Sequence, residues 1–286
     1  MPLAGGGSAT AGAGRKRPAP ARVRASRWLA CLACILGIQV ARADCPPDRI
    51  DERVRVSAVI DGDTLVLGDH RRVRLIGIDT PELGTDGGAH EAGALEARNR
   101  LRQLMFTHQW QISLRFDRER KDRYGRLLAH AFLADGRNLT EQLLETGSGS
   151  HLVVPPNTWQ ADCYASASAR ARTARNGIWA LPEYAPVLVQ DLGLREQGFR
   201  LVRGRVSHVS SSASAVWINL AGNFAARIEH QDIRDFAGVD LDGLAGADVE
   251  LQGWVYVRKG QPRMRLRHPT ALTILSRPLP PEESNR

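Results

Sequence analysis

Carboxylates crowd two short stretches of this sequence. Residues 61–64 read Asp-Gly-Asp-Thr, and residues 79–82 read Asp-Thr-Pro-Glu. Each stretch follows a predicted strand, and the strand ends of a small barrel can converge on one rim. Carboxylates gathered there repel by about 4 kcal/mol per pair at 4 Å and an effective dielectric near 20, so they need a cation. Each stretch alone is also an ordinary turn sequence.

An oxygen-rich cluster without His or Cys at ligand spacing favours a hard cation. Ca²⁺ suits it better than Mg²⁺ and far better than Zn²⁺. Two arginines accompany the acids: Arg74 precedes Asp79 by five residues, and Arg126 ends the run 122–126, Asp-Arg-Tyr-Gly-Arg. Each guanidinium matches two oxygens, so the pair could hold a phosphate beside the cation. Taken singly, each arginine is better explained as a solvated surface residue.

One strand must bend if these groups are to share a site. Strict alternation along a strand places Arg74 and Asp79 on opposite faces. A bulge or bend between them would bring them together, and Gly77 is the natural position for it.

The elements that position these residues follow from hydrophobic patterning. We expect strands at residues 54–60, 64–67, 72–78, 109–116 and 127–133, and helices at 90–106, 139–146 and 159–175. Five short strands with helices after the third and fifth predict a closed five-stranded barrel of the OB type. A second β-rich unit follows, with strands expected at 199–209, 215–220, 224–228, 249–257 and 263–267.

The fold class is therefore mainly β with α (α+β). We predict a signal peptide at 1–43, a first barrel domain with three helices at 44–183, a linker at 184–198, a smaller OB-like domain at 199–276 and a tail at 277–286.

The charge of the chain sits largely in its first segment. The formal net charge is +8, but residues 1–43 carry seven cations and no acid, and the remainder is nearly neutral. Residues 28–40 form an apolar run, too short for a permanent membrane span of about 20 residues. Small residues at 41 and 43 fit a signal-peptidase site. We expect cleavage after Ala43 and a periplasmic or secreted protein with no stable membrane span; an uncleaved anchor is the alternative.

Two cysteines would remain after cleavage, Cys45 and Cys163. An even pair in an oxidising compartment predicts a disulfide, and two unpaired thiols are the alternative.

Taken together, the motifs resemble the staphylococcal nuclease (thermonuclease) family. The matching residues, in unbroken order over about residues 53–180, are Val59-Ile60-Asp61-Gly62-Asp63-Thr64, Arg74, Asp79-Thr80-Pro81-Glu82, Asp122-Arg123-Tyr124-Gly125-Arg126 and Gly177-Ile178-Trp179. The resemblance implies an OB-barrel nuclease that uses one Ca²⁺ to hydrolyse DNA and RNA to 5′-hydroxyl and 3′-phosphate ends. We expect a monomer.

The resemblance also implies a metal site. It assigns the carboxylates of Asp63 and Asp79 and the backbone carbonyl of Thr80 to the metal. Asp61 supports this site without being a main ligand.

The catalytic residues follow in the same way. Arg74 and Arg126 match the pair that binds the scissile phosphate and stabilises charge as water attacks. Glu82 matches the glutamate usually described as the general base, or as the group that positions the water.

Two departures from the family pattern concern substrate binding. The family carries an aromatic residue, usually Tyr, after the second helix, whereas residues 151–156 here read His-Leu-Val-Val-Pro-Pro. Tyr124 remains as a supporting aromatic residue, and Trp159 or His151 could substitute. The loop at 83–91 also lacks two expected lysines, which weakens nonspecific backbone attraction.

The second unit carries an arginine pattern of its own. Arg263, Arg265 and Arg267 alternate along one strand, which could track a nucleic-acid backbone. A solvated outer face over an apolar core explains the pattern better. The unit weakly resembles OB-like extensions of some bacterial family members.

Two other functions remain open from the sequence. One is a noncatalytic OB module of the cell envelope that binds nucleic acid or protein, and retention of the acids and arginines argues against it. The other is an envelope protein whose second unit docks a partner.

Overall fold

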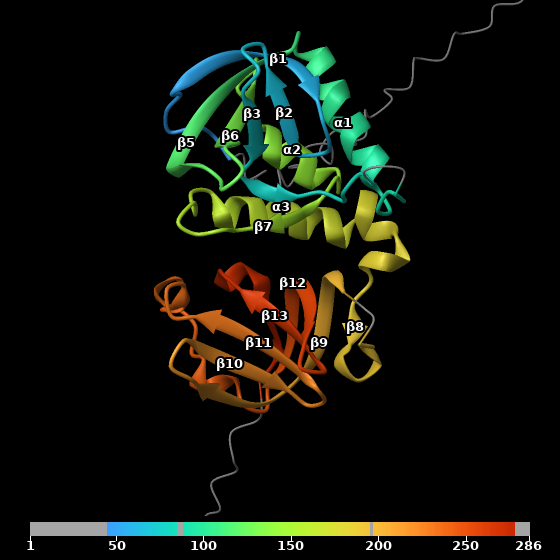
Figure 1. Cartoon of the computed structure of the whole chain (residues 1–286), viewed down its shortest axis with the longest axis vertical. Helices are drawn as coiled ribbons and strands as arrows, with labels where there is room; N and C mark the ends of the chain where they lie inside the picture. Colours follow the sequence, from blue (N-terminus) through green and yellow to red (C-terminus); the bar gives the residue numbers. More distant parts are fainter. Residues whose placement is uncertain (1–44, 85–87, 195–196, 278–286) are drawn as a thin grey trace, which may run out of the picture. The chain divides into compact units, whose positions relative to one another are not determined.

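The computed structural model describes residues 45–84, 88–194 and 197–277 (Figure 1). The predicted signal peptide, residues 85–87 of the acidic loop region and residues 278–286 of the tail lie outside the described residues.

Five strands of the first domain close into a barrel, as predicted (Figure 1). They are β1 (Glu52–Val59), β2 (Thr64–Leu67), β3 (Arg72–Leu75), β5 (Gln111–Lys121) and β6 (Leu127–Leu133). The order around the barrel is β1-β2-β3-β6-β5, with β3 and β6 parallel and the other pairs antiparallel. Closure pairs every strand on both sides, so the barrel has no free edge.

The strand expected at 72–78 is wrong as a single element, because the chain bends at Gly77. Strand β3 ends at Leu75, and β4 (Gly77–Asp79) leaves the barrel to pair with β7 (Ser150–Leu152). Gly77 has a φ of 93°, and a Cβ there would lie 2.2 Å from the ring of Tyr164, so only glycine fits. Strand β7 escaped prediction because it is three residues long with one large apolar side chain.

Three helices pack on the barrel, as predicted: α1 (Ala94–Thr107), α2 (Leu139–Glu145) and α3 (Ala161–Thr173). Helix α1 starts four residues later than expected. Its buried residues recur at helical spacing and face the core: Ala94, Ala97, Leu101, Leu104 and Met105. Helix α2 begins where the side chain of Asn138 accepts a hydrogen bond from the backbone N–H of Glu141.

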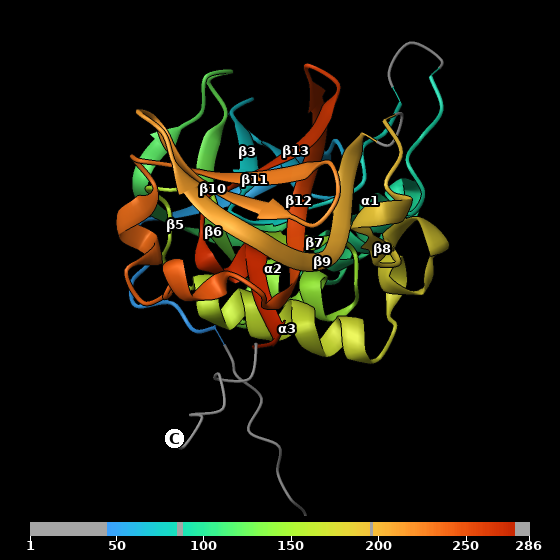
Figure 2. The ribbon, with the colours of Figure 1, turned by 90° about the horizontal axis from the view of Figure 1, so that it is seen from below.

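The second domain repeats the strand order of the first (Figure 2). Its strands are β9 (Gly198–Ser211), β10 (Ala215–Leu220), β11 (Phe224–Glu229), β12 (Asp248–Arg258) and β13 (Gln261–Leu266). Strand β11 pairs in parallel with β13, and β12 pairs back onto β9 to close the ring. This confirms the predicted second barrel-like domain.

Short elements complete the chain. Besides β7, two strands escaped prediction: β14 (Leu272–Ser276) extends the second sheet beside β12, and β8 (Val187–Leu188) pairs with β9 from within the segment expected as a linker. The 3₁₀ helices are η1 (Gly177–Ala180), η2 (Pro182–Tyr184), η3 (Val189–Asp191), η4 (Ile233–Phe236), η5 (Asp242–Leu244) and η6 (Pro269–Ala271). The two domains have separate apolar cores but belong to one compact unit of the chain.

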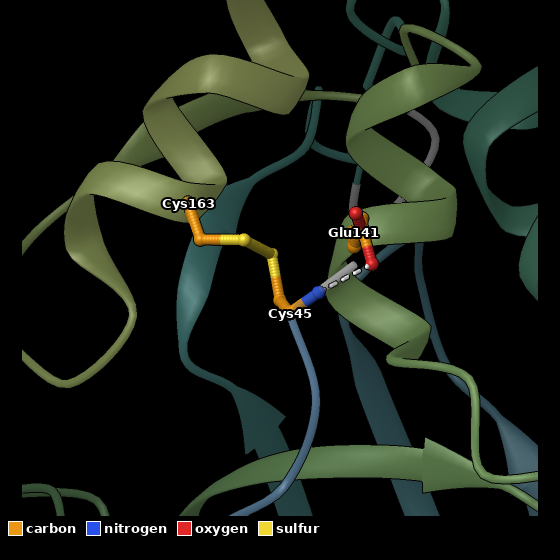
Figure 3. A group of neighbouring side chains, drawn as sticks. All are labelled: Cys45, Glu141 and Cys163. Atoms are coloured by element: carbon orange, nitrogen blue, oxygen red, sulfur yellow. Dashed lines mark hydrogen bonds between the residues drawn. A yellow bond between two sulfur atoms is a disulfide. The ribbon is translucent and has the colours of Figure 1, made fainter. Parts of the chain in front are cut away.

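The disulfide between Cys45 and Cys163 is present and ties the segment before β1 to α3 (Figure 3). The backbone N–H of Cys45 donates to a carboxylate oxygen of Glu141 at 3.1 Å. No helix among the described residues is both long and apolar enough to cross a membrane.

Candidate active site

The two acidic stretches meet through a hydrogen-bonded contact. Asp63, which is 4% exposed, accepts hydrogen bonds at 2.9 Å on Oδ2 from both the backbone N–H and the hydroxyl of Thr80. The loop that carries Asp63 can come this close because residue 62 is glycine. A Cβ at Gly62 would lie 2.7 Å from Oγ1 of Thr80 and 2.8 Å from Cβ of Ala97.

Arg74 joins the two stretches. Its Nη1 lies 2.6 Å from Oδ2 of Asp63, and its Nη2 lies 2.8 Å from Oδ1 of Asp79. Nη1 also donates to the backbone carbonyl of Ile78 at 2.9 Å, just beyond the bend at Gly77. The bend therefore brings Arg74 and Asp79 together although simple alternation would separate them.

The site holds more negative charge than Arg74 neutralises. Burial raises the pKa of Asp63 to about 7, and the nearby charges of Asp61 and Asp79 add to the effect of burial although Arg74 opposes it. Burial, with Asp61 and Asp79, also raises the pKa of Glu82. Burial acts to lower the pKa of Arg74, but the carboxylates around it outweigh burial and hold the pKa above its usual value. A further cation would relieve this imbalance.

The donor set fits a hard cation, because Asp61, Asp63, Asp79 and Thr80 offer only oxygen. Among the described residues, however, one group alone has three Cys, His, Asp or Glu ligand atoms within 4.8 Å of one another: Cys45, Glu141 and Cys163. Its two sulfurs are joined to each other and are not thiolates. The acids of the candidate site are less closely gathered, with Arg74 between two of them.

Arg126 is held by a turn that its own hydrogen bonds stabilise. Oδ1 of Asp122 accepts from the backbone N–H groups of Tyr124 and Arg126, and its Oδ2 lies 2.7 Å from Nε of Arg126. Arg126, Arg74 and Tyr124 all line one cavity of about 450 Å³. Tyr124 is 68% exposed, with the Arg126 guanidinium 5.6 Å from its ring centre. The structure thus brings both predicted phosphate-binding arginines to one cavity.

Glu82 and Asp61 lie near the ion pair of Arg74 and Asp63. The carboxylate of Glu82 makes no ion pair with any residue in the described part of the chain, and its backbone N–H donates to Glu91 at 2.8 Å. Oδ1 of Asp61 accepts from the backbone N–H of Asp63 at 3.0 Å, so Asp61 shapes the loop that presents Asp63.

Sequence reasoning missed one residue at this site. Trp254, on β12 of the second domain, donates from Nε1 to Oδ2 of Asp79 at 3.1 Å. The two residues are 175 positions apart, and a tryptophan in an alternating strand gives no signal for such a contact.

The proposed substitutes for the missing tyrosine are engaged elsewhere. Trp159 lies under the guanidinium of Arg115, 4.0 Å from its ring centre, and meets His130 edge to face. His151 is 6% exposed, and its Nε2 has no hydrogen-bond partner in the structure. Burial, with a smaller effect of His268, lowers the pKa of His151 to about 3.

A barrel that carries buried carboxylates paired with Arg74, and two arginines that line one cavity, has the kinds of groups that hydrolases of phosphate esters use. Comparison with known proteins gives the family. Residues 72–181 match the model of the staphylococcal nuclease homologue family. A thermonuclease of Staphylococcus intermedius is 33% identical over 159 residues, 53% of this chain and 93% of that protein.

Two further relatives extend the match. A thermonuclease of Staphylococcus hyicus is 30% identical over 134 residues, 46% of this chain and 77% of that protein. The succinoglycan biosynthesis protein ExoI of Rhizobium meliloti is 32% identical over 187 residues, 62% of this chain and 90% of that protein. The chain therefore belongs to the staphylococcal nuclease family. This confirms the resemblance and the enzyme class inferred from it, a hydrolytic nuclease.

Proposed function

We propose that this chain is an exported, Ca²⁺-dependent nuclease that hydrolyses phosphodiester bonds of DNA and/or RNA and leaves 5′-hydroxyl and 3′-phosphate ends. The observation that carries the proposal is the contact of Arg74 with both Asp63 and Asp79 beside the cavity that Arg126 also lines. The names of the thermonuclease relatives support nucleic acid as the substrate. The disulfide fits an oxidising, exported location, and we expect a monomer.

The metal site would use Asp63, Asp79 and the backbone carbonyl of Thr80, with Asp61 in support. When bound, Ca²⁺ polarises a phosphoryl oxygen and orients the nucleophile. The hydrogen bonds from Thr80 fix Asp63 in place, so a bound cation would meet a carboxylate that is already oriented.

The two arginines would bind the scissile phosphate. Arg126 pairs with Asp122 through Nε, which leaves its terminal nitrogens for phosphate oxygens. Arg74 reaches the same cavity from β3. Phosphodiester hydrolysis gathers negative charge on the equatorial oxygens, and cations fixed there lower the barrier.

Glu82 would act on the attacking water. Its pKa is higher than that of an ordinary glutamate and therefore closer to neutral pH. This suits a group that accepts or positions a proton. Attack of this water on phosphorus, with the O5′ atom as the leaving group, would leave a 3′-phosphate on one product and a 5′-hydroxyl on the other.

End-group analysis tests the proposal in one experiment. Single-stranded DNA and RNA are digested with Ca²⁺ and, in parallel, with a chelator. We expect cleavage with Ca²⁺ alone, and products that accept a 5′-phosphate from a kinase without prior phosphatase treatment. Products with 5′-phosphate ends would contradict the assigned chemistry, and undiminished cleavage in the chelator would contradict the metal.

A noncatalytic OB module is the second candidate. The acids and arginines of the site argue against it, since a binding module needs no such cluster. Nucleic-acid binding without cleavage in Ca²⁺ would favour it.

A further inference from the structure

The second domain contributes an aromatic side chain to the edge of the candidate active site. Trp254 donates to Asp79 through its indole N–H, yet 47% of the side chain remains exposed. The hydrogen bond therefore holds the indole ring beside Asp79, a predicted metal ligand, while other side chains cover only part of the ring. A flat exposed ring is a platform on which a nucleobase can stack.

A second cavity lies at this ring. It has a volume of about 370 Å³ and is lined by both domains, with Asp79 and His151 from the first and Phe199, Trp254 and Tyr256 from the second. Three of the sixteen lining residues are Phe, Trp or Tyr, and all three come from the second domain. Such a lining suits a ligand with flat faces.

One arginine connects the two cavities. Arg267, the residue that follows β13, lines both the cavity at Trp254 and the cavity that Arg74 and Arg126 line. A ligand chain leaving the first cavity toward Trp254 therefore passes Arg267.

Arg267 also differs from its neighbour in charge pairing. Arg265 lies 2.7 Å from Glu229 and 2.8 Å from Asp232. The guanidinium of Arg267 is half-buried and forms no hydrogen bond or ion pair with any described residue. Burial, followed by the charges of Arg265 and Arg227, lowers its pKa, and the charges of Asp232 and Glu229 oppose this only in part. A partly desolvated cation that makes no direct contact with a carboxylate is costly unless a ligand supplies an anion.

A residue with a buried, unpartnered ring nitrogen is part of the wall of the same cavity. His151 lines it, and its Nε2 is buried without a partner. Backbone contact fixes the residue, because its carbonyl accepts a hydrogen bond at 2.7 Å from the side chain of Gln252 on β12.

We propose that the cavity at Trp254 is a subsite for the nucleotide next to the scissile phosphate of single-stranded DNA or RNA. The base stacks on Trp254, and the adjoining phosphate binds Arg267. This inference rests on the proposed nuclease function and names how its substrate is held. A single strand is required, because a base inside a duplex has no free face to stack on an indole.

The subsite also explains a departure seen in the sequence. The segment after α2 lacks the tyrosine expected to contact a nucleotide, and β12 of the second domain supplies an aromatic ring beside Asp79 instead. The second domain would thus be part of the substrate-binding surface.

The test compares two substrates on the full chain with Ca²⁺. One is a single-stranded DNA of about 12 nucleotides, within the span an OB fold covers. The other is a nitrophenyl phosphodiester of one nucleoside, which is too short to reach the subsite. The measured quantity is the ratio of kcat/KM for the oligonucleotide to kcat/KM for the small substrate.

Trp254→Ala and Arg267→Gln are each expected to lower this ratio at least about 5-fold, mainly through KM for the oligonucleotide. Trp254→Phe keeps a ring and should retain most of the ratio. Two matched controls lie outside both cavities: Trp217→Ala removes an indole of the second domain, and Arg258→Gln removes an exposed guanidinium of β12. Both controls should keep the wild-type ratio.

The results that would contradict the proposed function differ from those that would contradict the subsite. A wild-type protein that cleaves neither substrate overturns the proposed function and the subsite with it. A wild-type protein that cleaves both, with the ratio unchanged in Trp254→Ala and Arg267→Gln, overturns the subsite alone. Equal losses on both substrates in Trp254→Ala would assign Trp254 to holding Asp79 rather than to stacking. Because the two variants are independent, misfolding of one leaves the other to decide.

Discussion

The two barrels have the same strand order, but the charged side chains around the third strand differ in sign: acids outnumber arginines in the first barrel, and arginines outnumber acids in the second. In the first barrel, Arg74 on β3 is outnumbered by the carboxylates of Asp61, Asp63 and Asp79. In the second, four arginines lie on β11, on β13 and just after β13 beside two acids: Arg227, Arg263, Arg265 and Arg267 with Glu229 and Asp232. One topology therefore gathers carboxylates around the third strand in one copy and guanidinium groups in the other.

Part of the difference lies in the loop between the first two strands. The loop between β1 and β2 carries Asp-Gly-Asp at 61–63, whereas the loop between β9 and β10 carries Ser-Ala-Ser at 212–214. There the hydroxyl of Ser212 hydrogen-bonds to the backbone of Ala215, and no carboxylate is offered. The strand order positions a loop, and the residues in that loop decide which ion or ligand it can bind.

The largest difference between the barrels in stability should come from the disulfide, which lies in the first. It closes a loop of 118 residues. The chain-entropy model gives such a bridge about 4–5 kcal/mol. The double variant Cys45→Ser, Cys163→Ser should lower the free energy of unfolding by about that amount, measured by urea denaturation. A loss below about 1 kcal/mol would show that the bridge adds little to a fold that other contacts already hold.

The turnover number kcat should depend on residues of the first barrel. Arg126→Ala and Glu82→Ala should each reduce kcat by at least about 100-fold, because each removes a partner of the developing charge or of the attacking water. Arg234→Ala, an exposed arginine of the second barrel, is the matched control and should retain wild-type turnover. Near-normal rates in both site variants, with folding intact, would remove the site assignment.

Ca²⁺ should stabilise the protein through Asp63. At a Ca²⁺ concentration 100 times the Kd, binding adds about 2.7 kcal/mol, which raises Tm. Asp63→Asn should abolish this shift. Asp232→Asn is the control, because Asp232 is a buried carboxylate of the second barrel that pairs with Arg265. Equal Ca²⁺ shifts in both variants would place the ion elsewhere.

Much of this arrangement can be predicted from local sequence. Strands β2, β6 and β10 have the predicted bounds, and the acidic stretches sit at strand ends as expected. The bend could be placed at Gly77 because alternation alone put Arg74 and Asp79 on opposite faces. These inferences worked because the interacting residues lie close together in the chain.

Contacts between segments that are far apart in the chain could not be predicted from the sequence. The pairing of β4 with β7 needs only three residues on each side, too few for a periodic pattern. The contact of Trp254 with Asp79 depends on how one strand of the second domain packs against the first. Hydrophobic alternation predicts that β12 exists, but not which of its exposed side chains meets another domain.

The smallest expected effect is on the pH dependence of stability. A buried histidine of the first domain should contribute to it, and an exposed histidine of the second should not. The pKa of His151 is about 3 in the folded protein and near 6.5 when unfolded, so the unfolded state binds the proton more tightly. Stability from this residue is complete above pH 6.5 and falls as the pH drops toward 3. Between pH 7.5 and 5 the loss should be about 2 kcal/mol.

Denaturant unfolding of His151→Gln across this range isolates the contribution. Buried His130, whose pKa is also lowered, and His268, which faces His151, titrate in both the wild type and the variant, so they cancel in the difference. His151→Gln should flatten the pH dependence by about 2 kcal/mol, whereas His208→Gln, an exposed residue of β9, should leave it unchanged. Parallel curves for all three proteins would mean that His151 is protonated within the fold, and that the cavity at Trp254 admits enough water to solvate its charge.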